Sequence, residues 1–274
     1  MKISTDMKKL TASIVLYNTD KDVLNKVVNS FTQTNLDIDL YLIDNSASEN
    51  SNHRYRSNNI HYIFNNANIG YGRAHNIALR KAIEISDYHI VLNPDIEFTS
   101  ETLDACIAFM NQQKNVGLLM PKVLYPNGEI QYLCKQIPTP FDLIMRRFIP
   151  SFLKPMFKAR LDAYELKFKD FSKSMEIPNL SGCFMFIRCE ALKTVGLFDE
   201  NFFMYLEDTD LSRRINSQYK TMYYPEASII HHYEKGSYKN YKLLKYHIQS
   251  AFYYFNKWGW LFDPTRNTIN NLLK

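Results

Sequence analysis

The sequence predicts an α/β protein with a mostly parallel central sheet flanked by helices and a C-terminal helical extension. Two observations predict this fold class. Short apolar runs rich in β-branched residues alternate with segments of helical periodicity, and each run ends at polar residues. Of the 274 residues, 46% are hydrophobic and 22% are charged, which is ordinary for a globular protein. A chain of this length can bury a sizeable core without disulfides or metals.

The first half of the chain predicts four strands and two helices. Strands are expected at residues 12–17, 38–43, 60–64 and 88–92. Asp20 can cap the first helix, whose apolar positions recur at helical spacing. A glycine-containing segment opens the second helix. Because ligands of such sheets bind beyond the carboxyl ends of the strands, the polar strand ends are candidate site residues: Asn18, Asp44, Asn45, Asn93 and Asp95.

The second half predicts further elements and one irregular segment. Residues 138–178 contain five of the ten prolines and show weak periodicity, so we expect a mobile or acceptor-side insertion within one domain. That domain is expected to span residues 1–238, and residues 239–274 to form the helical extension. The expected elements are helices at 100–113, 189–195, 204–215 and 240–258, and strands at 116–124 and 183–187.

Composition excludes several classes of protein. The four cysteines form no CxxC pair and no zinc-binding spacing, which favours buried thiols in a reducing compartment. The net charge of 33 − 28 = +5 is too small and too scattered to indicate nucleic-acid binding. No stretch approaches the ~20 apolar residues that span a bilayer. We therefore expect a cytoplasmic protein, with peripheral contact to the inner face of the cell membrane as the open alternative.

Taken in order, several motifs resemble the GT-A glycosyltransferases, in particular family 2 and its rhamnosyltransferase-like branch. The resemblance covers most of the chain, from Ser13 to about His232. Each motif alone is weak, and the ordered set is specific. The motifs are Ser13–Asn18, Asp44–Ser46, Asn68–Asn76, Leu92–Asp95, Gly196–Glu200, Phe203–Leu211, and His232 followed by Gly236-Ser237.

The resemblance implies an activity. It implies an inverting transfer of a sugar from a nucleoside diphosphate sugar, dTDP-rhamnose or a UDP-sugar, to a cell-surface polysaccharide or lipid-linked saccharide. By resemblance Asp208 is the general base, and Glu207 orients the acceptor or the base. Acidic residues also stabilise a helix N-terminus, and both interpretations can hold together. The same helix predicts an ion pair between Asp210 and Arg214, four residues apart.

The resemblance also implies a Mg²⁺ or Mn²⁺ ion held by Asp95 and His232. The spacing to Gly236-Ser237 selects His232 over His231, and two adjacent residues of a strand point to opposite faces. The family's usual Asp-x-Asp pattern here begins with Asn93. This change removes one negative charge, so it weakens metal binding or leaves Asn93 to contact the ribose. The Asn-Pro-Asp sequence is also typical of a simple turn.

The donor nucleotide is expected at the first two strand ends. Tyr17 or Asn18 could approach the base or ribose, and Asp44, followed by Asn45, could accept a hydrogen bond from a pyrimidine N–H. Cap or turn chemistry is the competing interpretation of Asp44 and Asn45.

The glycine-containing segment is expected to contribute to the same donor site. Gly70 is expected to let the backbone approach the nucleotide, with Arg73 near the diphosphate. Asn76 either binds the donor or fastens its helix.

Basic and aromatic residues suggest an acceptor side. Segments 141–148 and 152–158 mix apolar side chains with cations, and the final helix adds aromatic residues up to Phe262. Packing or a homodimer contact explains the final helix, and a lipid-linked acceptor with membrane contact is a further hypothesis. Two rival functions stay open: a nucleotidyltransferase, and a non-catalytic nucleotide- or saccharide-binding protein with a decayed metal site.

Overall fold

The computed structural model describes residues 10–49, 55, 57–148, 154–232 and 241–273, with the side chains of residues 145–148 left out. A nine-stranded mixed sheet lies at the centre, in the order β3-β2-β1-β4-β8-β6-β9-β5, and β7 pairs with β9. The strands are β1 (Leu10–Leu16), β2 (Ile38–Asp44), β3 (Ile60–Phe64), β4 (Tyr88–Leu92), β5 (Ile96–Glu97), β6 (Val116–Leu124), β7 (Met175–Glu176), β8 (Phe184–Arg188) and β9 (Lys220–His231).

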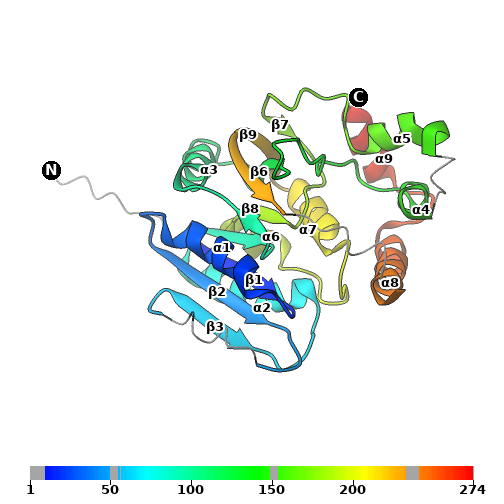
Figure 1. Ribbon diagram of the computed structural model, residues 1–274. Coiled ribbons are helices and arrows are strands. Elements are labelled where there is room, and N and C mark those ends of the chain that lie inside the picture. The colour runs from blue at the N-terminus through cyan, green and yellow to red at the C-terminus, as the bar shows by residue number, and fades with distance from the viewer. Residues whose placement is uncertain (1–9, 50–54, 56, 149–153, 233–240, 274) are drawn as a thin grey trace.

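Helices cover both sides of this sheet (Figure 1). The helices of the first part are α1 (Lys21–Thr32), α2 (Tyr71–Ile85), α3 (Ser100–Gln112), α4 (Pro140–Phe148) and α5 (Lys158–Tyr164), with a 3₁₀ turn at Lys154–Phe157. They are followed by α6 (Cys189–Val195), α7 (Glu207–Asn216), α8 (Tyr241–Trp258) and α9 (Pro264–Leu272). No helix among the described residues is long and apolar enough to cross a bilayer.

The N-terminal half of the sheet is parallel, as the alternating pattern predicts. Strands β3, β2, β1 and β4 pair in parallel, with Leu16 opposite Asp44 and Ile14 opposite Leu92. The carboxyl ends of β1, β2 and β4 therefore meet at one edge. Asp20 caps α1 by accepting a hydrogen bond from the backbone N–H of Asp22 at 2.8 Å, which confirms the predicted cap.

The C-terminal half of the sheet mixes directions. Strand β8 runs antiparallel to β4 and β6, whereas β9 runs parallel to β6. Alternate residues of β9 are buried, which is the pattern of a strand with one covered face. The short strands β5 and β7 and the helix α9 carry too few periodic residues to stand out in the sequence.

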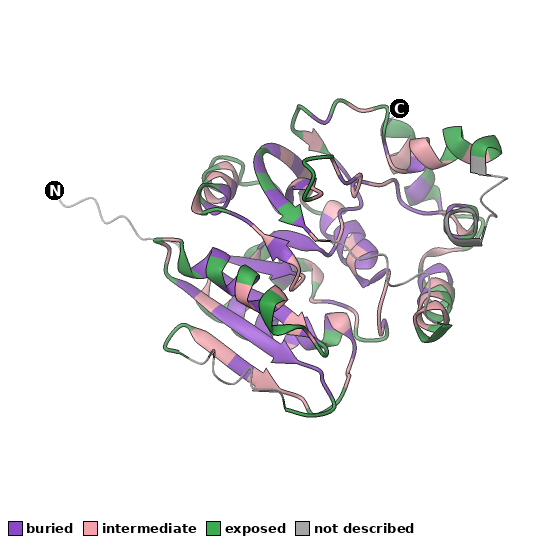
Figure 2. Cartoon of the chain, viewed as in Figure 1, coloured by how far each residue is buried: buried purple, intermediate pink, exposed green. Residues whose placement is uncertain are grey.

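Helix α8 packs its inner face against the segment that precedes α7. Tyr254 and Phe255 are buried in a small cluster with Phe202 and Leu206, and Figure 2 shows this inner face as buried and the outer face as exposed. A buried ion pair at 2.6 Å joins Arg213 of α7 to Asp263 at the start of α9. The predicted pair of Asp210 and Arg214 is also present, at 2.8 Å.

Candidate active site

Two adjoining cavities open beyond the carboxyl ends of the parallel strands. The first has a volume of about 640 Å³ and the second about 550 Å³. Tyr71, Asn93 and Met204 line both cavities, so these side chains form the wall between them. Two compartments separated by a thin wall suit a reaction that joins two substrates.

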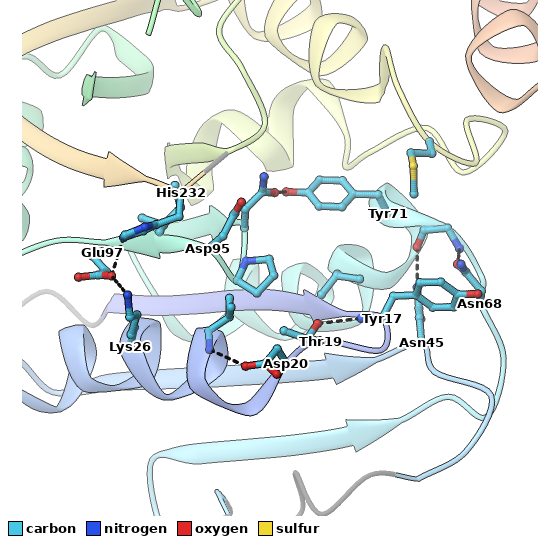
Figure 3. Close-up of a pocket in the computed structure, with 17 residues that line it drawn as sticks. Tyr17, Thr19, Asp20, Lys26, Asn45, Asn68, Tyr71, Asp95, Glu97 and His232 are labelled. Atoms are coloured by element: carbon cyan, nitrogen blue, oxygen red, sulfur yellow. Dashed lines mark hydrogen bonds and ion pairs between the residues drawn. The ribbon is translucent and has the colours of Figure 1, made fainter. Parts of the chain in front are cut away.

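The ends of three strands supply polar side chains to the first cavity (Figure 3). Tyr17 follows β1, Asn45 follows β2, and Asn93 and Asp95 follow β4. The amide of Asn45 donates a hydrogen bond to the carbonyl of Gly70 at 3.1 Å, which fixes the position of this loop beside the cavity. The arrangement follows from the parallel pairing of β1, β2 and β4.

The structure brings both candidate histidines near the end of β4. His231 Nε2 lies 3.4 Å from Asp95 Oδ1, and His231 lines the second cavity. His232 lines the first cavity, where its Nε2 atom lies 2.6 Å from Glu97 Oε1. The alternation of strand faces led us to expect that only one histidine faces the cleft. The two histidines accordingly line different cavities, His232 the first and His231 the second, and the choice between them as a metal ligand stays a prediction.

The donor set around Asp95 fits a divalent cation that is shared with a bound substrate. Asp95 Oδ1 is buried and has no hydrogen-bond partner among the described residues. Mg²⁺ and similar ions take carboxylate oxygens, and they commonly complete their shell with phosphate oxygens and water. Among the described residues no group of three or more His, Cys, Asp and Glu side chains could hold a metal ion. A cation bound here would need further oxygen ligands from a substrate or from water.

Two carboxylates lie at the start of α7 and line the second cavity. Glu207 and Asp208 follow Tyr205 and Leu206, whose φ angles of 73° and 65° are in the left-handed region. Non-glycine residues with such angles are strained, and strain of this kind concentrates at functional sites. The turn directs both carboxylates into the cavity while the helix continues behind them.

The two carboxylates differ in their surroundings. Asp208 Oδ2 accepts a hydrogen bond from the backbone N–H of Gly182 at 2.8 Å, and its Oδ1 accepts one from the N–H of Thr209 at 2.7 Å. Glu207 Oε2 is buried and has no hydrogen-bond partner among the described residues. Burial, and then the charge of Asp208, raise the pKa of Glu207 well above 4.5. The Glu207 carboxyl therefore favours its neutral form.

Tyr71 connects the two compartments, and the sequence analysis did not select it. Its hydroxyl contacts the carbonyl oxygen of Gly182 at 2.8 Å and Asn93 Oδ1 at 3.1 Å. Burial, and then the charge of Glu207, raise the pKa of Tyr71 well above 10. The position directly after Gly70, inside the motif at 68–76, was the only sequence signal for this residue.

Several predicted donor residues lie away from the cavities. Asp44 is fully buried and accepts a hydrogen bond from the Tyr62 hydroxyl at 2.7 Å, so its carboxylate is used inside the sheet. The backbone N–H of Asn18 donates to Ser46 Oγ at 2.9 Å, and Asn18 is not among the residues that line either cavity. Both contacts join neighbouring strands or strand ends. The turn chemistry of the competing interpretation is seen in a third contact, in which Asp44 Oδ1 accepts a hydrogen bond from the backbone N–H of Ser46 at 2.9 Å.

Two other predicted donor residues, both on α2, contact protein groups and line neither of the two cavities. Arg73 Nε lies 3.3 Å from Glu200 Oε2, and Asn76 Nδ2 donates to the carbonyl of Phe198 at 2.9 Å. Asn76 therefore fastens α2 to the segment before α7, and a contact of Asn76 with the donor stays a prediction. Neither residue lines either of the two cavities described above.

Gly70 lines the first cavity, but its missing side chain makes room for protein. A Cβ atom at Gly70 would lie 2.5 Å from the carbonyl oxygen of Phe203. The expected close approach of this backbone is therefore an approach to the segment before α7. Gly236 and Ser237, which guided the choice of histidine, lie outside the described residues.

The fold is that of the GT-A glycosyltransferases. It is similar to the structure of GalNAc-T7 with UDP, GalNAc and Mn²⁺, with a TM-score of 0.61 and 18% identity over 84% of this chain and 44% of that chain. It is also similar to the mannosyltransferase PcManGT from Pyrobaculum calidifontis in complex with GDP-Man and Mn²⁺, with a TM-score of 0.57 and 15% identity over 85% of this chain and 59% of that one. At these identities, the similarities establish the fold alone.

Residues 11–196 match the family described as Glycosyl transferase family 2, and the chain belongs to this family. It is 27% identical over 209 residues to the N-acetylglucosaminyl-diphospho-decaprenol L-rhamnosyltransferase of Mycobacterium tuberculosis, which is 71% of this chain and 66% of the relative. It is 25% identical over 194 residues to rhamnosyltransferase WbbL of Escherichia coli, which is 68% of this chain and 69% of that protein. The chain thus spans just under two thirds of the mycobacterial relative.

Proposed function

We propose that the protein is an inverting glycosyltransferase that moves a sugar from a nucleoside diphosphate sugar to a polysaccharide or lipid-linked saccharide. The observation that carries this proposal is the pair of adjoining cavities. One is lined by strand-end residues including Asp95, and the other by the carboxylates of Glu207 and Asp208. Similarity to two rhamnosyltransferases supports dTDP-rhamnose as the first donor to try, with UDP-sugars next.

The first cavity takes the donor in this proposal. Tyr17 and Asn45 contact the nucleoside, and Asn93 contacts the ribose or diphosphate. Asp95 with His232 or His231 would hold Mg²⁺ or Mn²⁺. The two similar structures solved with Mn²⁺ support a divalent cation in this fold. Such an ion would neutralise charge on the departing diphosphate.

The second cavity takes the acceptor. Asp208 accepts the proton of the acceptor hydroxyl as that oxygen attacks the anomeric carbon from the side opposite the diphosphate, and the bond from that carbon to the diphosphate oxygen breaks. Attack from the opposite side inverts the anomeric centre. Glu207 favours its neutral form because of its raised pKa, and it can then donate a hydrogen bond that orients the acceptor.

The experiment is an assay of nucleoside diphosphate release from a panel of nucleotide sugars, with and without Mn²⁺, in the presence of saccharide acceptors. Asp208→Asn is expected to lower transfer by at least about 100-fold, since a general base contributes on the order of 10²–10⁴-fold. Donor binding, measured by thermal shift, is expected to persist. Asp104→Asn on the exposed side of α3 is the matched control. Near-normal transfer by Asp208→Asn would refute the assignment of the base.

A further inference from the structure

Exposed apolar side chains continue from the outer face of α8 into the turn that follows it. Ile248 and Phe252 lie one helical turn apart on this face, and Trp260 packs its ring against Phe252 with centroids 5.1 Å apart. Leu261 and Phe262 are 78% and 89% exposed. We call these five residues the apolar edge. A contiguous exposed apolar surface of this kind commonly marks an interaction site.

Buried polar contacts hold this turn in place. The guanidinium of Arg266, a buried residue, donates to the carbonyl of Leu261 at 3.2 Å and to that of Trp260 at 3.4 Å. The backbone N–H of Arg266 donates to Asp263, which pairs with Arg213. Burial of a Leu or Phe side chain is worth about 1.5–3 kcal/mol. These contacts nevertheless hold the side chains of Leu261 and Phe262 in solvent, so the structure of the turn fixes their exposure.

The charge around the apolar edge favours an anionic surface as the partner. Between residues 241 and 273 the only acidic residue is Asp263, and it is buried against Arg213. Lys242 and Lys245 of α8 are exposed on the same helix. In a symmetric dimer formed through this face, two surfaces that carry lysines would face each other, and like charges repel. Aromatic and apolar side chains beside lysines are typical of segments that lie in a bilayer interface.

The apolar edge adjoins the second cavity through α8 and α4. His247 of α8 and Leu143 of α4 line that cavity, and the two helices pack against each other (Figure 1). Phe141 and Ile144 of α4 are exposed as well. Helices α4 and α8 therefore line the cavity with some of their residues, and neighbouring residues of the same helices expose apolar side chains to solvent.

We propose that the apolar edge docks the protein on a bilayer that contains anionic lipid, with Leu261 and Phe262 inserted among the lipids. The position of the edge then presents the second cavity to an acceptor held at the bilayer surface. Only this last point rests on the proposed function, because docking itself requires no sugar transfer.

The experiment measures co-sedimentation of the full chain with vesicles at low salt. Phosphatidylglycerol–phosphatidylcholine vesicles are expected to bind it, and vesicles of phosphatidylcholine alone to bind it much less. The double variant Leu261→Asp/Phe262→Asp is expected to lower the bound fraction at least about tenfold, because it removes two inserted side chains. Ile85→Asp, which changes an exposed apolar residue at the end of α2, is the matched control and is expected to bind normally.

Three results would overturn the proposal. The first is no binding to either kind of vesicle, and the second is undiminished binding of the double variant with a normal thermal unfolding curve. The third is a dimer detected by light scattering that the double variant abolishes, which would assign the edge to a second copy. Release of nucleoside diphosphate with a soluble acceptor is expected to be equal in both variants. Its absence in the unaltered protein would count against the proposed function and not against docking.

Discussion

Tyr71→Phe is the substitution that tests most directly how the two cavities cooperate. It removes one hydroxyl from the wall that they share and leaves the aromatic ring in place. The ring packs edge-on against His75, with centroids 4.4 Å apart. Any effect therefore reports on the hydrogen bonds to Gly182 and Asn93 rather than on packing.

The magnitude follows from the groups left behind. Gly182 is held from both sides, since its carbonyl accepts from Tyr71 and its N–H donates to Asp208. Loss of the hydroxyl leaves a buried acceptor without its partner, which costs about 1–3 kcal/mol. If this cost displaces Asp208 and raises the free energy of the transition state by the same amount, kcat falls by roughly 5- to 150-fold. About 1.4 kcal/mol corresponds to a factor of ten in rate. KM for the donor is expected to change by less than about threefold, because Tyr71 acts through Asp208 and supplies little uniform donor binding.

The assay is steady-state release of nucleoside diphosphate over a range of donor concentrations and pH values. Because the pKa of Tyr71 is raised well above 10, its hydroxyl stays protonated throughout, and the shape of the pH profile is expected to persist in the variant. Tyr223→Phe is the matched control, since that buried hydroxyl also donates to a backbone carbonyl, of Phe171 at 3.0 Å. A normal kcat for Tyr71→Phe, or an equal loss in both variants, would refute the positioning role.

Two further predictions concern stability. Gly70→Ala is expected to lower the free energy of unfolding by about 1–3 kcal/mol, measured by urea titration. The reason is that φ at this position is +93° and the new Cβ would collide with the carbonyl of Phe203. An unchanged unfolding midpoint would show that the segment at Phe203 can move aside without cost. Buried His89, hydrogen-bonded to Ser13 at 2.7 Å, has its pKa lowered by burial from 6.5 to about 3. The unfolded chain therefore binds this proton more readily, so stability is expected to fall as pH drops from about 6.5 towards 3. His89→Gln is expected to flatten that slope in thermal unfolding scans, and an identical slope would exclude His89 as its source.

Local pattern in the sequence determined the first half of the fold and the elements that supply the site. The alternation of apolar runs and helical segments predicted β1 to β4, and parallel pairing then brought Tyr17, Asn45 and Asp95 to one edge. Contacts between near neighbours were equally readable, as in the pair of Asp210 and Arg214. Such features depend only on the direction in which side chains leave a strand or helix.

Only the tertiary structure decided which polar residues face the cavities. Asp44 accepts a hydrogen bond from Tyr62. Arg73 forms an ion pair with Glu200, which is more than 100 positions away along the chain. The space at Gly70 is taken by Phe203, and the hydroxyl of Tyr71 meets Gly182. Each partner lies on another segment of the chain, 18 positions away for Asp44 and Tyr62 and 111 positions away for Tyr71 and Gly182. Spacing along the chain sets the face on which a side chain lies, whereas packing between segments distant in sequence sets what that side chain meets.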